Sequence, residues 1–222
     1  AIYGENGNTG SGFGGKIQAS EDGIVYFVFG STRGKYDNSI EQYVTFKVTI
    51  ENGSIVSCEE TENIIADFSS NKTDTNGSAI ANTQAEEWSD NQKDYVLYTG
   101  TIENITGTFD NNYAGGNGGA IYNSGMLESI KNSSFSNNTA EGLGGAIYSS
   151  NGLNLFSSEY DMLFENNKDS TGANDIYMEG GELNINLTNN GTITFESGIN
   201  GKDYNINTSG DGTGTLNINS SF

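Results

Sequence analysis

Residues 109–122 read FDNNYAGGNGGAIY, and residues 135–148 read FSNNTAEGLGGAIY. In both segments a Phe is followed three residues later by Asn, and eleven residues later by a small residue that precedes Ile. The same offsets occur in two further segments, beginning at Phe68 and Phe164, although the second has Asp175 at the small position. Four copies with one internal spacing indicate a structural repeat. The repeat positions are Phe68, Asn71 and Ile80; Phe109, Asn112 and Ile121; Phe135, Asn138 and Ile147; and Phe164, Asn167 and Ile176.

The spacing of the copies predicts the fold class. Successive Phe residues are 41, 26 and 29 positions apart, and a period in the high twenties with glycine-rich corners is typical of a parallel β-solenoid. The local pattern has period two, as where Leu183, Ile185 and Leu187 alternate with Asn184 and Asn186. No window shows the three-four spacing of a helix. We therefore expect an all-β chain whose apolar side chains point inward and whose asparagines point outward.

Vertical stacking of like residues is the physical basis of this prediction. In parallel register, equivalent residues of successive coils meet every ~4.8 Å. The Phe positions should form an interior aromatic stack, and the Asn positions a ladder of amides bonded to the coils on either side. The Gly-Gly pairs suit corners with unusual φ and ψ, and the absence of proline suits strands that donate to both neighbours. Dividing the chain by the repeat suggests about eight coils, or a rod of ~40 Å.

The repeat does not extend over the whole chain. Residues 1–60 lack the full motif, although residues 24–29 and 44–50 have strand patterns. We expect residues 1–60 to form an N-terminal cap together with the first coils, and residues 61–222 to be parallel β-helix repeats. The final pattern at residues 215–219 has no polar cap after it, which predicts that the segment is a fragment of a longer solenoid.

Composition excludes several functions. The 222 residues contain no histidine and one cysteine, so imidazole-dependent triads, thiolate clusters and disulfide scaffolds are excluded. The formal net charge of −20, with nine Lys and Arg, argues against nucleic acid as a partner. The longest apolar run, residues 23–30, is too short to span a bilayer, so we expect no membrane insertion by this segment.

The GGAI motifs at 118–121 and 144–147 and the four Phe/Asn pairs resemble those of chlamydial polymorphic outer-membrane proteins. They also resemble the wider set of autotransporter passenger domains. The likeness covers about residues 64–219; the first copy departs from it, because residues 76–82 read NGSAIAN without Gly-Gly or Tyr. The resemblance implies a right-handed, pectin-lyase-like parallel β-helix, export by a signal peptide, and anchoring through a C-terminal outer-membrane β-barrel that lies outside this sequence.

Residues 83–94 interrupt the repeat with a polar stretch that we expect to loop out laterally. Its Trp88 could stack on a sugar ring or a protein partner, with Glu86, Glu87 and Asp90 beside it. The alternative is that Trp88 folds back as a lid on the solenoid wall. Acidic clusters here and at 59–62 could in principle hold calcium, but no calcium-binding register is present, so no metal or cofactor is predicted.

We expect an exported, non-catalytic passenger segment that acts as an adhesin or cell-surface coat, with a glycan or protein of a host or neighbouring cell as partner. The alternative is a polysaccharide-degrading β-helix, such as a glycosidase or phage tail spike, which would need two carboxylates about 5–9.5 Å apart in a surface groove. A third hypothesis is a filament subunit that self-associates end to end through residues 215–219.

Overall fold

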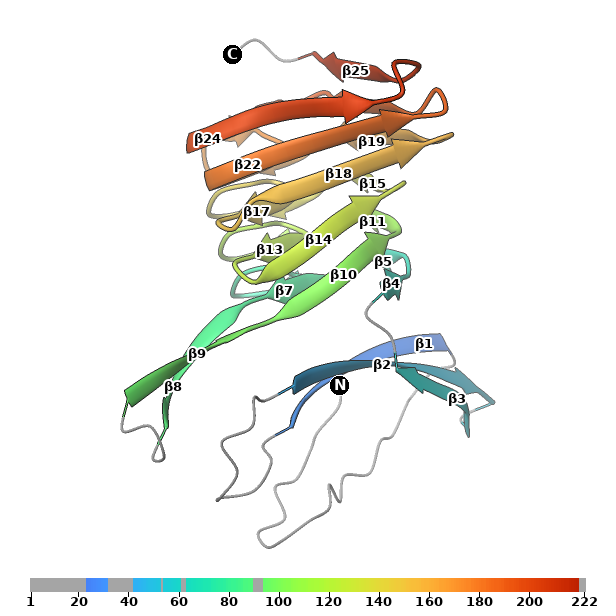
Figure 1. The fold of residues 1–222 in the computed structure, drawn as a ribbon, viewed down its shortest axis with the longest axis vertical. Coiled ribbons are helices and arrows are strands. Elements are labelled where there is room, and N and C mark those ends of the chain that lie inside the picture. Colours follow the sequence, from blue (N-terminus) through green and yellow to red (C-terminus); the bar gives the residue numbers. More distant parts are fainter. Residues whose placement is uncertain (1–22, 32–41, 53, 61–62, 90–93, 220–222) are drawn as a thin grey trace, which may run out of the picture. The chain divides into compact units, whose positions relative to one another are not determined.

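The structure, a computed structural model, describes residues 23–31, 42–52, 54–60, 63–89 and 94–219 (Figure 1). These residues fall into two compact units that meet in the sequence at Thr61 and Glu62. Every regular element in them is a β-strand.

The first unit is a three-stranded antiparallel sheet rather than a set of coils. Its strands are β1 (Gly23–Ser31), β2 (Gln42–Glu51) and β3 (Ser54–Glu60), paired in that order. The strand patterns at 24–29 and 44–50 are confirmed, and Val48 and Ile50 are buried as their alternation requires. The prediction that this region supplies the first coils is wrong for residues 23–31, 42–52 and 54–60, because antiparallel strands do not form the rungs of a parallel solenoid. The rest of residues 1–60 lies outside the described residues. Capping of the solenoid by this unit stays a prediction.

The second unit is a parallel β-solenoid of about five coils, whereas about eight were expected; the described strands between residues 23 and 60 form the antiparallel sheet instead of coils. Each early coil has four short strands, and equivalent strands of successive coils pair in parallel register (Figure 1). The first coil contains β4 (Asn63–Ile65), β5 (Phe68–Ser69), β6 (Lys72–Thr73) and β7 (Ile80–Asn82). The second contains β10 (Thr101–Thr106), β11 (Thr108–Asp110), β12 (Tyr113–Ala114) and β13 (Ile121–Asn123). The third contains β14 (Met126–Lys131), β15 (Ser134–Ser136), β16 (Thr139–Ala140) and β17 (Ile147–Ser149).

The later coils have longer strands that run across a corner. The fourth coil contains β18 (Leu153–Ser158), β19 (Asp161–Glu165), β20 (Lys168–Asp169) and β21 (Gly172–Ala173), and it closes with the start of β22 (Ile176–Thr188). Residues 176–178 of β22 pair with β17 and residues 183–188 pair with β18, so one strand belongs to two faces. Gly180 and Gly181 have φ values of 90° and 79°, which let the strand bend between them. The described chain continues through β23 (Thr192–Phe195), β24 (Ile199–Gly210) and β25 (Thr215–Ile218).

The repeat phenylalanines form one interior column. Phe109, Phe135 and Phe164 are fully buried, and adjacent rings from Phe68 to Phe164 stack with centroids 4.6–4.9 Å apart. Phe195 continues the column at 4.8 Å from Phe164, although it has no Asn three residues later. The isoleucines of the repeat also stack in register, with Ile121, Ile147 and Ile176 fully buried. The predicted interior stack is confirmed and is one residue longer than expected.

The repeat asparagines form the predicted amide ladder beside the Phe column. Asn112 Nδ2 donates to Asn138 Oδ1 at 2.9 Å and to the backbone carbonyl of Phe68 in the preceding coil at 3.0 Å. Asn112 Oδ1 accepts the side-chain and backbone N–H groups of Asn71 at 2.9 and 3.0 Å. Asn138 and Asn167 repeat this arrangement. Each amide thus satisfies buried polar groups of three consecutive coils.

Asp175 ends the ladder and explains its own departure from the motif. In the next coil the Asn position, three residues after Phe195, is Gly198, which has no side chain. Asp175 Oδ1 accepts from Asn167 Nδ2 at 2.8 Å, and its Oδ2 accepts from the backbone N–H groups of Ser197 and Gly198 at 2.8 and 3.2 Å. The carboxylate therefore accepts the backbone N–H of the Gly198 position, which in the other coils is accepted by the amide oxygen of an asparagine.

The Gly-Gly pairs are required by both conformation and space. Gly118 and Gly144 have φ values of 67° and 73°, as expected for a corner. A Cβ on Gly119 would lie 1.9 Å from the carbonyl oxygen of Gly145, so the second glycine permits the close approach of successive coils. In the first coil Gly77 takes the first position and Ser78 the second, where the Ser78 hydroxyl donates to the Gly119 carbonyl at 2.5 Å.

Phe135→Ala should lower the free energy of unfolding by about 3–5 kcal/mol, because it opens a cavity in the middle of the stack. Denaturant unfolding of the 222-residue chain measures the loss. Phe156→Ala is a matched control, since Phe156 lies on the outer side of β18 and is half-buried; it should cost less than half as much. Equal losses in the two variants would contradict an interior stack.

Asp175 should make stability depend on pH between about 4 and 6. Its burial raises the pKa from 3.8 to about 6, although the hydrogen bonds from Asn167, Ser197 and Gly198 lower it. Because the folded pKa lies above the unfolded one, this contribution is full below about pH 4 and is lost as the pH rises to about 6; the difference corresponds to about 3 kcal/mol. Unfolding of the parent chain and of Asp175→Asn, measured at pH 4 and pH 7, isolates this group from the other carboxylates. A pH-independent difference between the two chains would refute the assignment.

Candidate functional site

The face formed by β14, β18, β22 and β24 carries rows of polar side chains on its outer side. Along β22, Leu183, Ile185 and Leu187 are buried and the intervening residues are partly exposed, as the alternation predicted. Asn184 Nδ2 donates to Asn154 Oδ1 at 2.8 Å, and Asn184 Oδ1 accepts from Asn207 Nδ2 at 2.9 Å. Three coils are therefore linked by a second amide row on the surface. This row fixes the side chains of Asn154 and Asn184.

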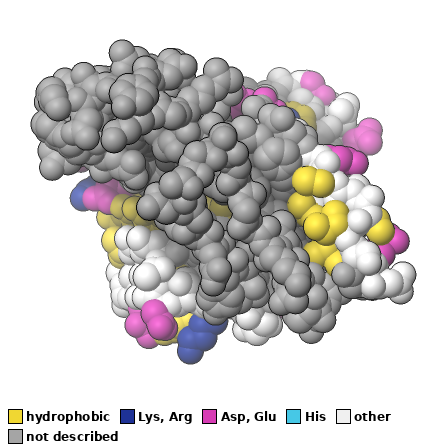
Figure 2. All heavy atoms as spheres, turned by 90° about the horizontal axis from the view of Figure 1, so that it is seen from below, with side chains coloured by type: hydrophobic (Ala, Val, Ile, Leu, Met, Phe, Trp, Pro, Cys, Tyr) yellow, Lys and Arg dark blue, Asp and Glu magenta, His cyan; other side chains and the backbone are white. Residues whose placement is uncertain are grey.

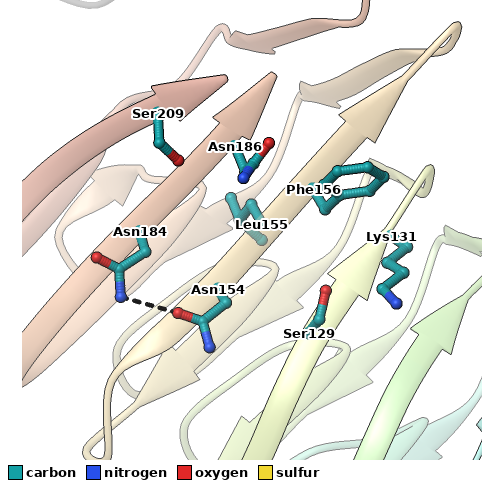
Figure 3. Close-up of a pocket in the computed structure, with 8 residues that line it drawn as sticks. All are labelled: Ser129, Lys131, Asn154, Leu155, Phe156, Asn184, Asn186 and Ser209. Atoms are coloured by element: carbon teal, nitrogen blue, oxygen red, sulfur yellow. Dashed lines mark hydrogen bonds between the residues drawn. The ribbon is translucent and has the colours of Figure 1, made fainter. Parts of the chain in front are cut away.

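A groove of about 310 Å³ lies along this amide row on the same face (Figure 3). Its volume is at the lower end of the ~300–1,000 Å³ range of small-ligand sites. Three neighbouring strands line it: β14 with Ser129 and Lys131, β18 with Asn154, Leu155 and Phe156, and β22 with Asn184 and Asn186. Ser209 of β24 closes the row beyond Asn186.

Three groove residues lie side by side in register. Lys131 is opposite Phe156 across β14 and β18, and Phe156 is opposite Asn186 across β18 and β22. Within the described residues Lys131 makes no ion pair or side-chain hydrogen bond, and Asn186 Oδ1 is buried without a donor. The groove thus combines an uncompensated cation with an aromatic ring, and the Asn186 Oδ1 beneath it is closed to solvent. No carboxylate belongs to its lining.

The tyrosines that follow Ile121, Ile147 and Ile176 form a further column, in which Tyr148 is buried and the other two are partly exposed. Tyr122, Tyr148 and Tyr177 stack with centroid separations of 5.1 and 5.8 Å. The Tyr148 hydroxyl donates to Glu179, and burial together with this carboxylate raises the pKa of the phenol. Glu179 also pairs with Lys202, which lowers the pKa of the Glu179 carboxyl. The charges of Glu179 and Lys202 thus compensate each other, whereas the charge of Lys131 has no such partner among the described residues.

The predicted binding stretch at 83–94 is a hairpin rather than a polar loop. Residues 84–89 form β8 (Gln84–Ser89), which pairs antiparallel with β9 (Asp94–Thr99) between the first and second coils. Glu86, Glu87 and Trp88 lie in β8, with Trp88 opposite Tyr95, and Asp90 lies outside the described residues. The pattern of residues 94–99, DYVLYT, could have predicted the second strand. The hairpin extends away from the coils (Figure 1).

Sequence reasoning placed Asn184 and Asn186 on the outer side but did not find the groove. Lys131 and Phe156 lie outside the quoted motifs, and their neighbourhood depends on the offset between coils of unequal length. The register of Ile130 with Leu155, together with the period-two rule, would have placed Lys131 beside Phe156.

Charge and metal-binding groups give no further site in the described parts of the chain. There, no three Cys, Asp or Glu residues lie close enough to hold a metal ion. In its coloured part, Figure 2 shows Asp and Glu at several separate places and few Lys or Arg. Among the described residues, no helix is long and apolar enough to cross a bilayer.

Comparison with known proteins supports the family resemblance. The family model of the Chlamydia polymorphic membrane protein repeat matches residues 106–124 and 132–150. These ranges contain Phe109, Asn112, Phe135 and Asn138 of the ladder and both GGAIY corners. Neither the curated proteins nor the solved structures gave a match. Two segments of the chain are thus similar to the Chlamydia polymorphic membrane protein repeat, and both lie on a parallel β-solenoid, which fits a surface-exposed passenger.

Proposed function

We propose that this chain is a segment displayed at a bacterial cell surface, where it acts as a non-catalytic adhesin or coat. The observation that carries the proposal is the coincidence of the two matched membrane-protein repeats with the stacked Phe and Asn columns. The repeat Phe, Asn and Ile residues are used in stacking between coils. The outward positions of each strand therefore remain available for contacts. Export and anchoring through a further segment belong to the same proposal.

The groove chemistry favours binding over catalysis. Glycoside hydrolysis uses two carboxyl groups about 5–9.5 Å apart, and the groove lining contains neither Asp nor Glu. Its amides, hydroxyls and ring are groups that hold a ligand without activating a nucleophile. A glycan or protein of another cell is therefore the partner proposed, and the acidic surface argues against nucleic acid.

Surface display is tested by treating intact cells that express the native protein with a protease and detecting the chain with an antibody against residues 1–222. Loss of the signal from intact cells is expected, with a cytoplasmic protein as the control that survives. Recovery of the intact chain in the cytoplasmic fraction would refute the proposal.

Adhesion is tested with beads that carry the 222-residue chain. Beads should attach to host or neighbouring cells, whereas beads that carry Trp88→Ala should attach less if the hairpin contributes to contact. The variant should keep the parent melting temperature, because β8 and β9 connect the first coil to the second and form a separate two-stranded sheet. A lower melting temperature would instead support the lid hypothesis for Trp88.

An adhesin and a coat differ in self-association. In the described part, β24 pairs only with β22 and β25 only with β23, so this last coil has a neighbour on one side. Concentration-dependent rods in light scattering would support a coat that grows end to end. A monodisperse monomer that still attaches to cells would support an adhesin.

A further inference from the structure

We infer that the groove on β14, β18 and β22 binds a pyranose that carries a carboxylate, as found in sialic acids and uronic acids. This inference names a ligand class for the proposed adhesin and therefore rests on the proposed function. The coil register places Lys131 beside Phe156, and Asn154 beside Asn184 on the same face (Figure 3).

The aromatic ring provides the surface for a sugar ring. Phe156 stands on the outer side of β18, half-buried, between two polar neighbours and not in the interior Phe column. An exposed phenyl ring in a polar face is costly to leave in water and gains by covering the apolar C–H side of a pyranose. Neighbouring strands lie ~4.8 Å apart, so the residues flanking Phe156 reach the edge of a ligand that covers it.

The amides provide the contacts for hydroxyl groups. Asn154 and Asn184 are fixed by their mutual hydrogen bond of 2.8 Å, so their orientation does not have to be organised when a ligand binds. The Asn186 Oδ1 is closed to solvent, so the contacts to ligand hydroxyl groups come from the partly exposed Asn154 and Asn184.

Charge selects an acidic sugar over a neutral one. Lys131 is the only cation of the lining, which contains no carboxylate, and it has no ion-pair partner among the described residues. Lys202 of β24, by contrast, is paired with Glu179. The chain carries a net charge of −20, but charges beyond about 8 Å are largely screened at physiological salt. The attraction of a ligand carboxylate therefore depends on its contact with Lys131.

The test measures binding of three soluble probes to the 222-residue chain by calorimetry or ligand-observed NMR: sialyllactose, an unsulfated glucuronate-containing disaccharide, and lactose. Either acidic probe or both should bind, and lactose should bind at least tenfold more weakly. Binding of sialyllactose alone assigns the site to sialic acid, and binding of the glucuronate disaccharide alone assigns it to uronates. Absence of binding by both acidic probes, or equal binding of lactose, overturns the inference.

Matched variants locate the binding on the protein. Lys131→Met removes the charge and keeps the length of the side chain, and it should weaken binding of the acidic probe at least tenfold. Lys168→Met makes the same change at the exposed Lys168 of β20, on another face, and should bind like the parent. Phe156→Ala should also lose binding, and an unchanged circular dichroism spectrum and melting curve of Lys131→Met exclude misfolding. Unchanged affinity of Lys131→Met overturns the inference.

The outcome is separable from that of the proposed function. If beads carrying Lys131→Met attach to cells as well as the parent does, the chain remains an adhesin and the groove is not its site. If the parent chain binds acidic sugars but is found in the cytoplasm, the groove stands and surface display fails.

Discussion

The first four coils are tied to one another by asparagine amides that reach in both directions along the solenoid. The Nδ2 of Asn138 donates to the Phe109 carbonyl of the preceding coil and to Asn167 of the following one, and its Oδ1 accepts two N–H groups of Asn112. No other residue type of this size offers two donors and an acceptor that fit this geometry. The amide is fully buried, so leaving any of these partners unsatisfied is costly.

The ladder imposes the register on which the other columns depend. Because Asn112, Asn138 and Asn167 lie directly above one another, the Phe three residues before each must stack as well. The outer face obeys the same constraint, since Lys131 lies beside Phe156 only through this register. Interior packing and surface chemistry thus follow from one set of hydrogen bonds.

The repeat predicted the coils in which its motif is complete. The prediction of coils failed for the strands between residues 23 and 60, which pair antiparallel with their neighbours in the sequence. The offsets between Phe, Asn and Ile contain the register directly, so the columns and the all-β class could be predicted. Phe195 was missed because Gly198 stands at the Asn position of its coil. Asp175, 23 residues earlier, makes the corresponding hydrogen bonds, and no local motif shows this substitution. The strands of residues 23–60 were found, but alternation alone does not distinguish an antiparallel partner from a parallel one. The groove combines side chains of three coils, and the unequal lengths of those coils concealed their proximity.

The β8–β9 hairpin shows that coil length and coil stacking are independent. The Phe68 and Phe109 coils are separated by 41 residues and the Phe109 and Phe135 coils by 26, yet both pairs keep the same ring spacing and the same amide contacts. The extra residues leave and re-enter the wall at adjacent points, since Gly100 donates its backbone N–H to the Thr83 carbonyl. The wall is therefore closed by the Thr83–Gly100 hydrogen bond, and the residues between them can lengthen a coil without entering the columns on either side.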